Sequence, residues 1–284
     1  MVPTVTRRTP HSSDRPGPAP DPAGDHHERR IRSFQPRRGR VTTAQRGALE
    51  RLWPLWGVEV DGRHRLDLAA LFATTPAPDA SPDSDRPAEG AAPEGARPPE
   101  GGAPSEETEL PVVLEVGFGM GEATARMAAA DPTTGILAVD VHTPGQGNLL
   151  RLAEAAGLAN VRVANGDAII LLRTMLEPDS LAGMRVYFPD PWPKARHQKR
   201  RLIQPEFLDV AAGPLRSGAL VHCATDWADY AEQMLDVLTA HPEYENTRAD
   251  GGFAERPASR PLTRFEGQGL DKGHEVFDLL FRRR

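Results

Sequence analysis

The sequence predicts an α/β fold with a doubly wound, mostly parallel sheet and helices on both faces, and three observations support it. Residues 112–116 form an apolar, β-branched run that is too short for a helix and is typical of a buried strand. Alternate glycines follow this run, and a segment of helix-forming residues begins at Glu122. Short apolar strands and helical segments then alternate along the chain, as they do in parallel α/β sheets.

The glycine turn after this first strand contains Gly117, Gly119 and Gly121. A dinucleotide-binding turn requires its third glycine one position later, where this chain has Glu122. Glu115, just before the turn, would repel a pyrophosphate but can pair with an ammonium group. Glycines at such a turn allow a ligand to approach the backbone closely. The stretch is similar to the first motif of class I S-adenosylmethionine-dependent methyltransferases, and a glycine-rich turn of another α/β fold is the alternative.

Length and composition narrow the class of protein. A chain of 284 residues with 39% hydrophobic content can bury the core of one large domain or of two small ones. Cys223 is the single cysteine, which excludes an internal disulfide and favours a reducing compartment. No apolar stretch has the length of a membrane span, and the N-terminus lacks the apolar core of a signal peptide. We therefore expect a cytoplasmic protein that uses neither a membrane nor a metal.

Composition also divides the chain into four parts. Residues 1–28 have almost nothing to bury, and residues 73–108 consist almost entirely of Pro, Ala, Gly, Asp, Glu and Ser. Neither part can offset the entropy cost of ordering, so both are expected to be disordered. Between them, residues 29–72 are predicted to form a basic arm and a helix that packs on the main domain. That domain occupies residues 109–284.

Positive charge is concentrated in three segments, although the formal net charge is −6. Basic residues gather in residues 29–46, in residues 194–201 and at residues 282–284. Local potential, rather than total charge, attracts a polyanion, so the net acidity does not exclude nucleic acid. A solvated surface is the alternative for each segment. We favour RNA contact for residues 194–201 because they follow a loop on the ligand edge of the sheet.

The elements before the glycine turn are short. Thr42 or Thr43 is expected to cap a helix at residues 44–53, whose apolar side chains pack inward. An edge element is expected at residues 58–68, with a short apolar patch at its end.

A second strand, predicted at residues 135–140, ends in Asp140. A carboxylate about twenty positions after the glycines accepts hydrogen bonds from ribose hydroxyls in nucleoside-binding sheets, and a charged strand end is the alternative. A helix is predicted at residues 148–156. A third strand at residues 160–165 leads to Asp167, whose carboxylate is placed to accept a hydrogen bond from the amine of an adenine.

A fourth strand, predicted at residues 184–188, leads into Asp190, which lies between two prolines. Ligands of doubly wound sheets bind beyond the carboxyl ends of the strands, so this carboxylate is a candidate for contacting a substrate base. Trp192 offers a face for stacking, and the basic run behind it can hold a nucleic acid backbone. A further strand at residues 219–224 leads to Asp226, which either completes the pocket or caps the next helix.

Five stretches carry a family resemblance: residues 114–121, 140–147, 188–201, 224–230 and 260–266. Together they resemble the bacterial tRNA (guanine(46)-N7)-methyltransferase family. The resemblance implies a seven-stranded class I methyltransferase (Rossmann-like) sheet, S-adenosylmethionine as the cofactor, tRNA as the substrate and methyl transfer to N7 of guanine 46 in the variable loop. The chain departs from the family pattern at Asp140, where a longer Glu is usual, at Pro193, and in the insertion.

The resemblance also implies individual site residues. Cofactor contacts are expected from Glu115, Gly117, Gly119, Gly121, Asp140, Asp167 and Asp190. Substrate contacts are expected from Lys194, Asp226, Thr263, Arg264, Phe265 and Glu266. RNA contacts are expected from Arg196, His197, Gln198, Lys199, Arg200 and Arg201. Asp190 is the expected catalytic residue, which holds the guanine and offsets the positive charge that methylation creates.

Two other functions compete with this one. A class I methyltransferase for another RNA or a small molecule is the first, and a small-molecule substrate gives the basic segments no purpose. A non-catalytic RNA-binding module is the second, and it is favoured if S-adenosylmethionine does not bind. A monomer or a homodimer is expected.

Overall fold

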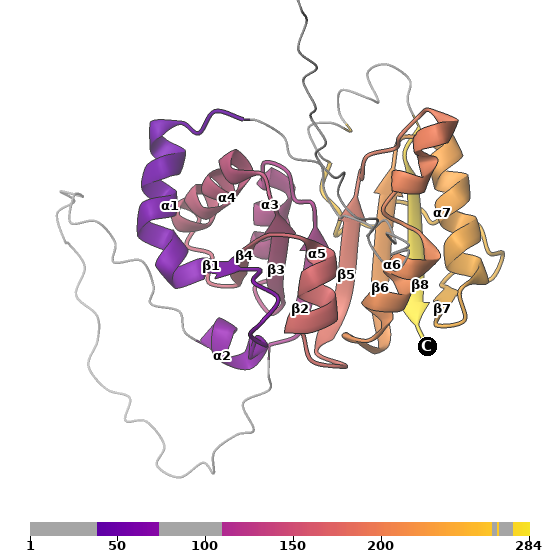
Figure 1. The fold of residues 1–284 in the computed structure, drawn as a ribbon, viewed down its shortest axis with the longest axis horizontal. Coiled ribbons are helices and arrows are strands. Elements are labelled where there is room, and N and C mark those ends of the chain that lie inside the picture. The colour runs from indigo at the N-terminus through magenta and orange to yellow at the C-terminus, as the bar shows by residue number, and fades with distance from the viewer. Residues whose placement is uncertain (1–38, 74–109, 263–265, 267–274) are drawn as a thin grey trace, which may run out of the picture. The chain divides into compact units, whose positions relative to one another are not determined.

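The computed structural model describes residues 39–73, 110–262, 266 and 275–284, and Figure 1 shows their fold. The helices are α1 (Thr43–Trp56), α2 (Leu68–Ala73), α3 (Glu122–Ala130), α4 (Thr143–Ala155), α5 (Ala168–Ile170), α6 (Pro205–Ala212) and α7 (Ala228–Ala240), with a π-helical turn η1 (Leu171–Met175) and a 3₁₀-helix η2 (Ala195–Arg200). The strands are β1 (Gly57–Glu59), β2 (Val112–Val116), β3 (Gly135–Asp140), β4 (Val161–Asn165), β5 (Leu181–Tyr187), β6 (Leu215–Thr225), β7 (Tyr244–Asn246) and β8 (Phe277–Arg283).

Several predictions fall on parts of the chain outside the described residues. These parts are residues 1–28, the arm as far as residue 38, the insertion from residue 74 to 108, and Thr263, Arg264 and Phe265.

The described strands form one eight-stranded sheet in the order β1-β4-β3-β2-β5-β6-β8-β7. Strands from β1 to β6 pair in parallel, and β8 pairs antiparallel with β6 and with β7. The predicted α/β class with a doubly wound, mostly parallel sheet is confirmed. The described part of the sheet has eight strands rather than the expected seven, because the short β1 pairs with β4 as an additional edge strand.

Helices cover both faces of the sheet (Figure 1). One apolar cluster joins α1, α3 and α4 to the sheet and includes Trp56 and Leu149. The other joins η1, α6 and α7 to the opposite face and includes Phe207 and Met234. Cys223 lies buried in β6, where burial raises the pKa of its thiol to about 12. The cysteine is therefore a packed strand residue, as predicted.

Helix α1 begins with reciprocal capping. The Gln45 N–H donates to Thr42 Oγ1 at 3.3 Å, and the Thr42 N–H donates to Gln45 Oε1 at 2.9 Å. The helix continues through Pro54 to Trp56, past the predicted end at residue 53. Burial of Trp56 outweighs the break that a proline inside a helix favours.

Helix α4 starts at Thr143, earlier than the predicted residue 148, with Pro144 in its first turn. Gly145 and Gly147, in the first turns of α4, are typical of a loop when the sequence is taken alone, but in the structure they allow close packing. A Cβ on Gly145 would lie 1.8 Å from the carbonyl oxygen of Gly119, and one on Gly147 would lie 2.7 Å from that of Gln45. Helix α4 therefore packs directly against both the glycine turn and α1.

Candidate functional site

Parallel pairing brings the predicted acidic residues to one edge of the sheet. Val116 lies in register with both Val139 and Val186, so these strand ends are level. The residues that follow the strand ends are the glycine turn after β2, Asp140 at the end of β3, Asp167 after β4, Asp190 after β5 and Asp226 after β6. This edge is where ligands bind in doubly wound sheets.

The glycine turn leaves space beside its backbone. Gly117, Gly119 and Gly121 have φ angles of 79°, 61° and 78°. A Cβ on Gly117 or Gly119 would meet nothing within 4 Å, whereas one on Gly121 would lie 2.7 Å from the Cβ of Leu149. The first two glycines therefore border open space that a ligand can fill, and the third packs against α4.

Glu115 lies directly before this turn and is 3% exposed. Its Oε2 atom has no hydrogen-bond partner among the described residues, and burial raises the pKa of its carboxyl to about 7. Arg185, its register partner on β5, has a buried Nη1 atom that also lacks a partner there. Arg185 attracts the Glu115 carboxylate, but neither of these two atoms has a hydrogen bond among the described residues, and a ligand that carries both an ammonium and a carboxylate group would supply one to each. No sequence pattern pointed to Arg185.

Two other predicted cofactor residues hold local backbone. Asp140 accepts the Gly119 N–H on Oδ2 at 3.1 Å and the His142 N–H on Oδ1 at 3.0 Å. Asp167 accepts the Ile169 N–H on Oδ1 at 3.0 Å and so caps α5. A carboxylate oxygen has two lone pairs, so these bonds orient the groups without exhausting their acceptors. The bond to Gly119 also links the glycine turn to the end of β3.

The loop that carries Asp190 has an unusual backbone. Phe188 and Trp192 are non-glycine residues with φ angles of 50° and 47°. Each costs about 1 kcal/mol or more, and such strain persists only where the surrounding structure imposes it. The Phe188 N–H donates to the Ala224 carbonyl at 2.7 Å, which ties the loop to β6. The half-buried Asp190 is therefore fixed relative to two neighbouring strands.

Arg201 holds the other side of this loop. Its Nε donates to the Pro191 carbonyl at 2.8 Å, its Nη1 donates to Gln233 Oε1 at 2.5 Å, and its Nη2 forms an ion pair with Asp229. The residue is 2% exposed, with its guanidinium 4.8 Å from the centre of the Tyr230 ring. Arg201 therefore makes its described side-chain contacts within the protein, largely to α7, and its RNA contact stays a prediction.

The other members of the predicted RNA segment lie on or beside η2. Those exposed on the surface are Lys194, Arg196, Lys199 and Arg200, while those partly buried are His197 and Gln198. Partial desolvation and then the cations Arg200 and Arg196 lower the pKa of His197, as expected in a positive surface. The Arg200 guanidinium lies 5.1 Å from the centre of the Trp192 ring. One face of Trp192, the predicted stacking residue, is therefore occupied.

Asp226 follows β6 at the start of α7. The Trp227 N–H donates to Thr225 Oγ1 at 3.3 Å, and no side chain bonds at the N-cap position of α7. The N-cap residue of α7 is Trp227, so Asp226, whose alternative role was to cap this helix, lies one residue before the cap position. Trp227 beside it is 40% exposed, an aromatic surface that the sequence reasoning passed over although it directly follows a strand end.

Glu266 is the one described member of the predicted substrate motif at residues 263–266. It is 3% exposed, and its oxygens accept from Arg260, with Nη1 to Oε2 at 2.7 Å and Nη2 to Oε1 at 2.8 Å. An internal arginine therefore engages this carboxylate, and its contact with the substrate stays a prediction. Arg260 was missed as a functional candidate although it begins the same sequence motif.

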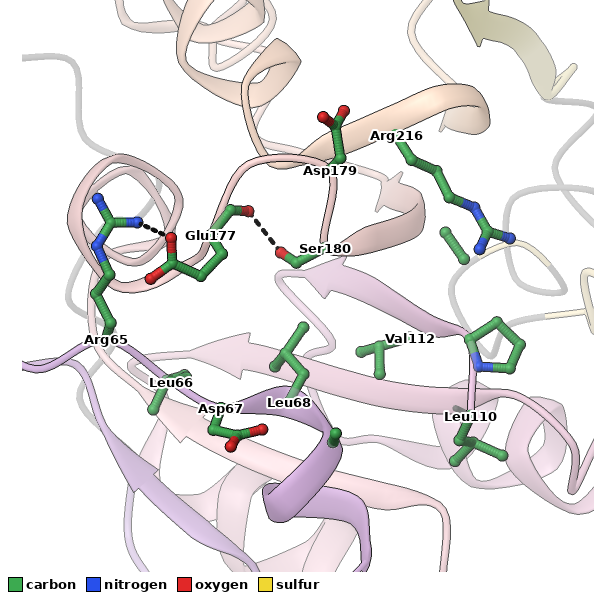
Figure 2. A pocket seen from close by; sticks show the side chains of 13 residues that line it. Arg65, Leu66, Asp67, Leu68, Leu110, Val112, Glu177, Asp179, Ser180 and Arg216 are labelled. Atoms are coloured by element: carbon green, nitrogen blue, oxygen red, sulfur yellow. Dashed lines mark hydrogen bonds and ion pairs between the residues drawn. The ribbon is translucent and has the colours of Figure 1, made fainter. Parts of the chain in front are cut away.

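A cavity of about 470 Å³ lies at the opposite edge of the sheet and is not the predicted site. Figure 2 shows it beside the amino ends of β2 and β5, near Val112 and Ser180, with Arg65 turned toward Glu177. Within the described ranges, no three His, Cys, Asp or Glu side chains are grouped so that they could hold a metal ion. Of the helices in the described part of the chain, none has the length and apolar character of a membrane span.

Comparison with known proteins adds to this geometry. A family model described as "Putative methyltransferase" matches residues 109–279. A Streptomyces avermitilis protein named "tRNA (guanine-N(7)-)-methyltransferase" is 67% identical over 94% of this chain and 80% of its own length. A protein of the same name from Streptomyces coelicolor is 67% identical over 94% of this chain and 86% of its own length. Another from Halorhodospira halophila is 46% identical over 90% of this chain and 96% of its own length.

Proposed function

The chain belongs to the tRNA (guanine-N(7)-)-methyltransferase family, and we propose that it transfers the methyl group of S-adenosylmethionine to N7 of guanine 46 in the variable loop of tRNA. The identity of 67% over 94% of the chain carries this proposal. The arrangement of acidic residues along one sheet edge supports it, because that edge is where such a site belongs.

The residues at the carboxyl ends of β2 to β5 fit S-adenosylmethionine. Its methionine end carries an ammonium and a carboxylate group, which would satisfy the unpartnered atoms of Glu115 and Arg185. Asp140 would accept hydrogen bonds from the ribose hydroxyls, and Asp167 would accept one from the adenine amine. The space beside Gly119 allows the ligand to lie against the backbone. When bound, this cofactor supplies a methyl group on a positively charged sulfur.

The substrate nitrogen needs little activation. N7 of guanine carries a lone pair and no proton at neutral pH, so no strong general base is required. The protein acts by alignment, which can contribute several kcal/mol. Asp190 holds the guanine through its N1–H and amine, and its negative charge stabilises the positive charge that develops on the ring. The strained loop, tied to β6 through Phe188 and to α7 through Arg201, holds this carboxylate in place.

Exposed cations beside the loop would bind the rest of the tRNA. Lys194, Arg196, Lys199 and Arg200 present positive charge next to Asp190 in the sequence and on the surface. Neutralising phosphates releases counterions, so the affinity for tRNA should fall steeply as salt concentration rises. A cytoplasmic location and a monomeric or homodimeric state stay predictions.

An assay with purified protein tests the function directly. The protein is incubated with unmodified tRNA and labelled cofactor, and the product is treated by alkaline reduction, which permits chain scission at 7-methylguanine. We expect scission at position 46. Label in the tRNA without scission would indicate another methylated atom, and cofactor binding without label would indicate another substrate. Failure to bind the cofactor would favour the non-catalytic RNA-binding module.

A further inference from the structure

A chain of buried polar side chains connects three strands on the substrate side of the molecule. The Tyr187 hydroxyl on β5 lies 2.9 Å from Nδ1 of His222 on β6. Nε2 of His222 lies 2.7 Å from Oδ1 of Asp278 on β8. Asp278 also accepts from Arg260, with Nε to Oδ1 at 2.7 Å and Nη2 to Oδ2 at 2.9 Å. The sheet therefore fixes Asp278, and Asp278 fixes Arg260.

Arg260 is the point where this chain branches. The residue is 1% exposed, and its guanidinium makes two hydrogen bonds to Asp278 and two to Glu266. The same group lies 5.9 Å from the centre of the Tyr187 ring and 5.8 Å from that of the Phe188 ring. Burial lowers the pKa of Arg260, but its hydrogen bonds to Glu266 and Asp278 outweigh this and raise it, so the group stays charged.

The two branches lead to different parts of the proposed substrate site. One ends at Glu266, a predicted substrate contact. The other runs through the rings of Tyr187 and Phe188 to the strained loop, in which Asp190 follows two positions after Phe188. These parts lie far apart along the chain, and Arg260 contacts both. Only a planar guanidinium can bind two carboxylates side-on and also lie over aromatic rings.

We propose that Arg260 is a positioning residue for methyl transfer, which fixes Glu266 and the loop carrying Asp190 relative to each other. The inference rests on the proposed function and deepens it, since it names the residue that keeps the substrate side of the site aligned. The reaction rate depends steeply on such alignment, and a displacement of about 1 Å can lower the rate on the order of a hundredfold.

The test replaces Arg260 with lysine, which keeps the charge but cannot bind both carboxylates side-on. The matched control is Arg248→Lys, because Arg248 also binds one carboxylate through two hydrogen bonds, to Asp250 at 2.9 and 2.5 Å, but on the exposed surface. Calorimetric titration with S-adenosylhomocysteine counts the sites that bind the cofactor product. The turnover number on tRNA is then expressed per such site, and thermal unfolding is recorded in parallel.

We expect Arg260→Lys to lower the turnover number per site by roughly a hundredfold, with the dissociation constant for S-adenosylhomocysteine changed by less than about threefold. Arg248→Lys should change neither quantity. A purely structural role would lower the unfolding temperature and the number of sites but leave turnover per site at the wild-type value, and that result would overturn the proposal.

A second variant keeps the test decisive if Arg260→Lys does not fold. Glu266→Gln retains the shape of the side chain but weakens one branch, and we expect roughly a tenfold loss of turnover per site. If Arg260→Lys does fold, the two losses of turnover should not add in the double variant, because both substitutions act through the same contact between Arg260 and Glu266. Full additivity, or wild-type turnover per site in Glu266→Gln, would reject the inference. Absence of turnover in the unsubstituted protein would instead reject the proposed function.

Discussion

The two halves of the sheet edge are built in different ways. The proposed cofactor half lies on the side of β2, β3 and β4, where backbone geometry forms the site. Its glycines have positive φ, Asp140 accepts the N–H groups of Gly119 and His142, and Asp167 accepts that of Ile169. The proposed substrate half lies on the side of β5, β6 and β8, where side chains form the site. Arg201 and Arg260 bind carboxylates and a carbonyl oxygen that other segments of the chain contribute. A site made of backbone tolerates few substitutions locally, whereas a site made of buried ion pairs depends on distant partners.

The environments of two buried arginines show what such partners do. Arg162, on the cofactor half, donates to carbonyl oxygens, including that of Leu71 at 2.8 Å, and burial lowers its pKa to about 10. Arg260, on the substrate half, meets two carboxylates, which outweigh its burial and raise its pKa. Carbonyl oxygens satisfy the donors of a guanidinium, whereas carboxylates also compensate its charge. The substrate half therefore consists of compensated charges that keep fixed positions.

The largest effect is expected at Asp190. Replacing it with alanine should lower the turnover number by roughly 10²- to 10³-fold, since a charge that stabilises the transition state is lost. Cofactor binding, which depends mainly on the other half, should change little. Turnover on tRNA and titration with S-adenosylhomocysteine measure the two halves separately. The control is Asp236→Asn, on the exposed face of α7. If Asp190→Ala methylates tRNA at the wild-type rate, the loop that carries Asp190 does not contribute to methyl transfer.

Neighbouring arginines allow a sharper comparison within the substrate half. Arg201→Met removes the bonds to Pro191, Gln233 and Asp229, and it should lower the free energy of unfolding by about 2–3 kcal/mol and turnover by at least tenfold. Arg200→Met removes an exposed cation, so stability should stay within about 0.5 kcal/mol while tRNA affinity falls and its salt dependence weakens. Chemical denaturation and a salt series of tRNA binding distinguish the two. Equal effects on stability would contradict the assignment of Arg201.

This pair also shows what the sequence can and cannot predict. The strand ends and the glycine turn follow from local patterns, so the sequence placed Glu115, Asp140, Asp167 and Asp190 at one edge. Arg200 and Arg201 are indistinguishable in a basic run, because the partners of Arg201 lie on α7, about thirty residues later in the chain. The pairing of Glu266 with Arg260 was missed for the same reason, since Arg260 is held by Asp278 on a strand that comes later in the chain. Long-range pairing, rather than composition, decides which charge is buried.

The cofactor half has an electrostatic exception to its backbone construction, and the titration of this group leads to the last prediction. The carboxyl of Glu115 titrates near 7 in the free protein because burial opposes its charge. Since this raised pKa belongs to the folded state, Glu115 favours folding below its unfolded pKa, and that contribution is lost as pH rises to about 7. A bound ammonium group would hold the carboxylate ionised, so binding must release a proton below pH 7.

The dissociation constant for S-adenosylhomocysteine should therefore rise by up to about tenfold for each pH unit between about 7 and 5, where the ligand amine stays protonated. Glu115→Gln should bind more weakly at pH 8 but should lose this slope, because the amide does not titrate. Calorimetry in buffers of different ionisation enthalpy counts the released proton directly. Equal slopes in the two proteins would show that Glu115 stays ionised without a ligand, and the unpartnered oxygen before the glycine turn would then not be the ammonium site.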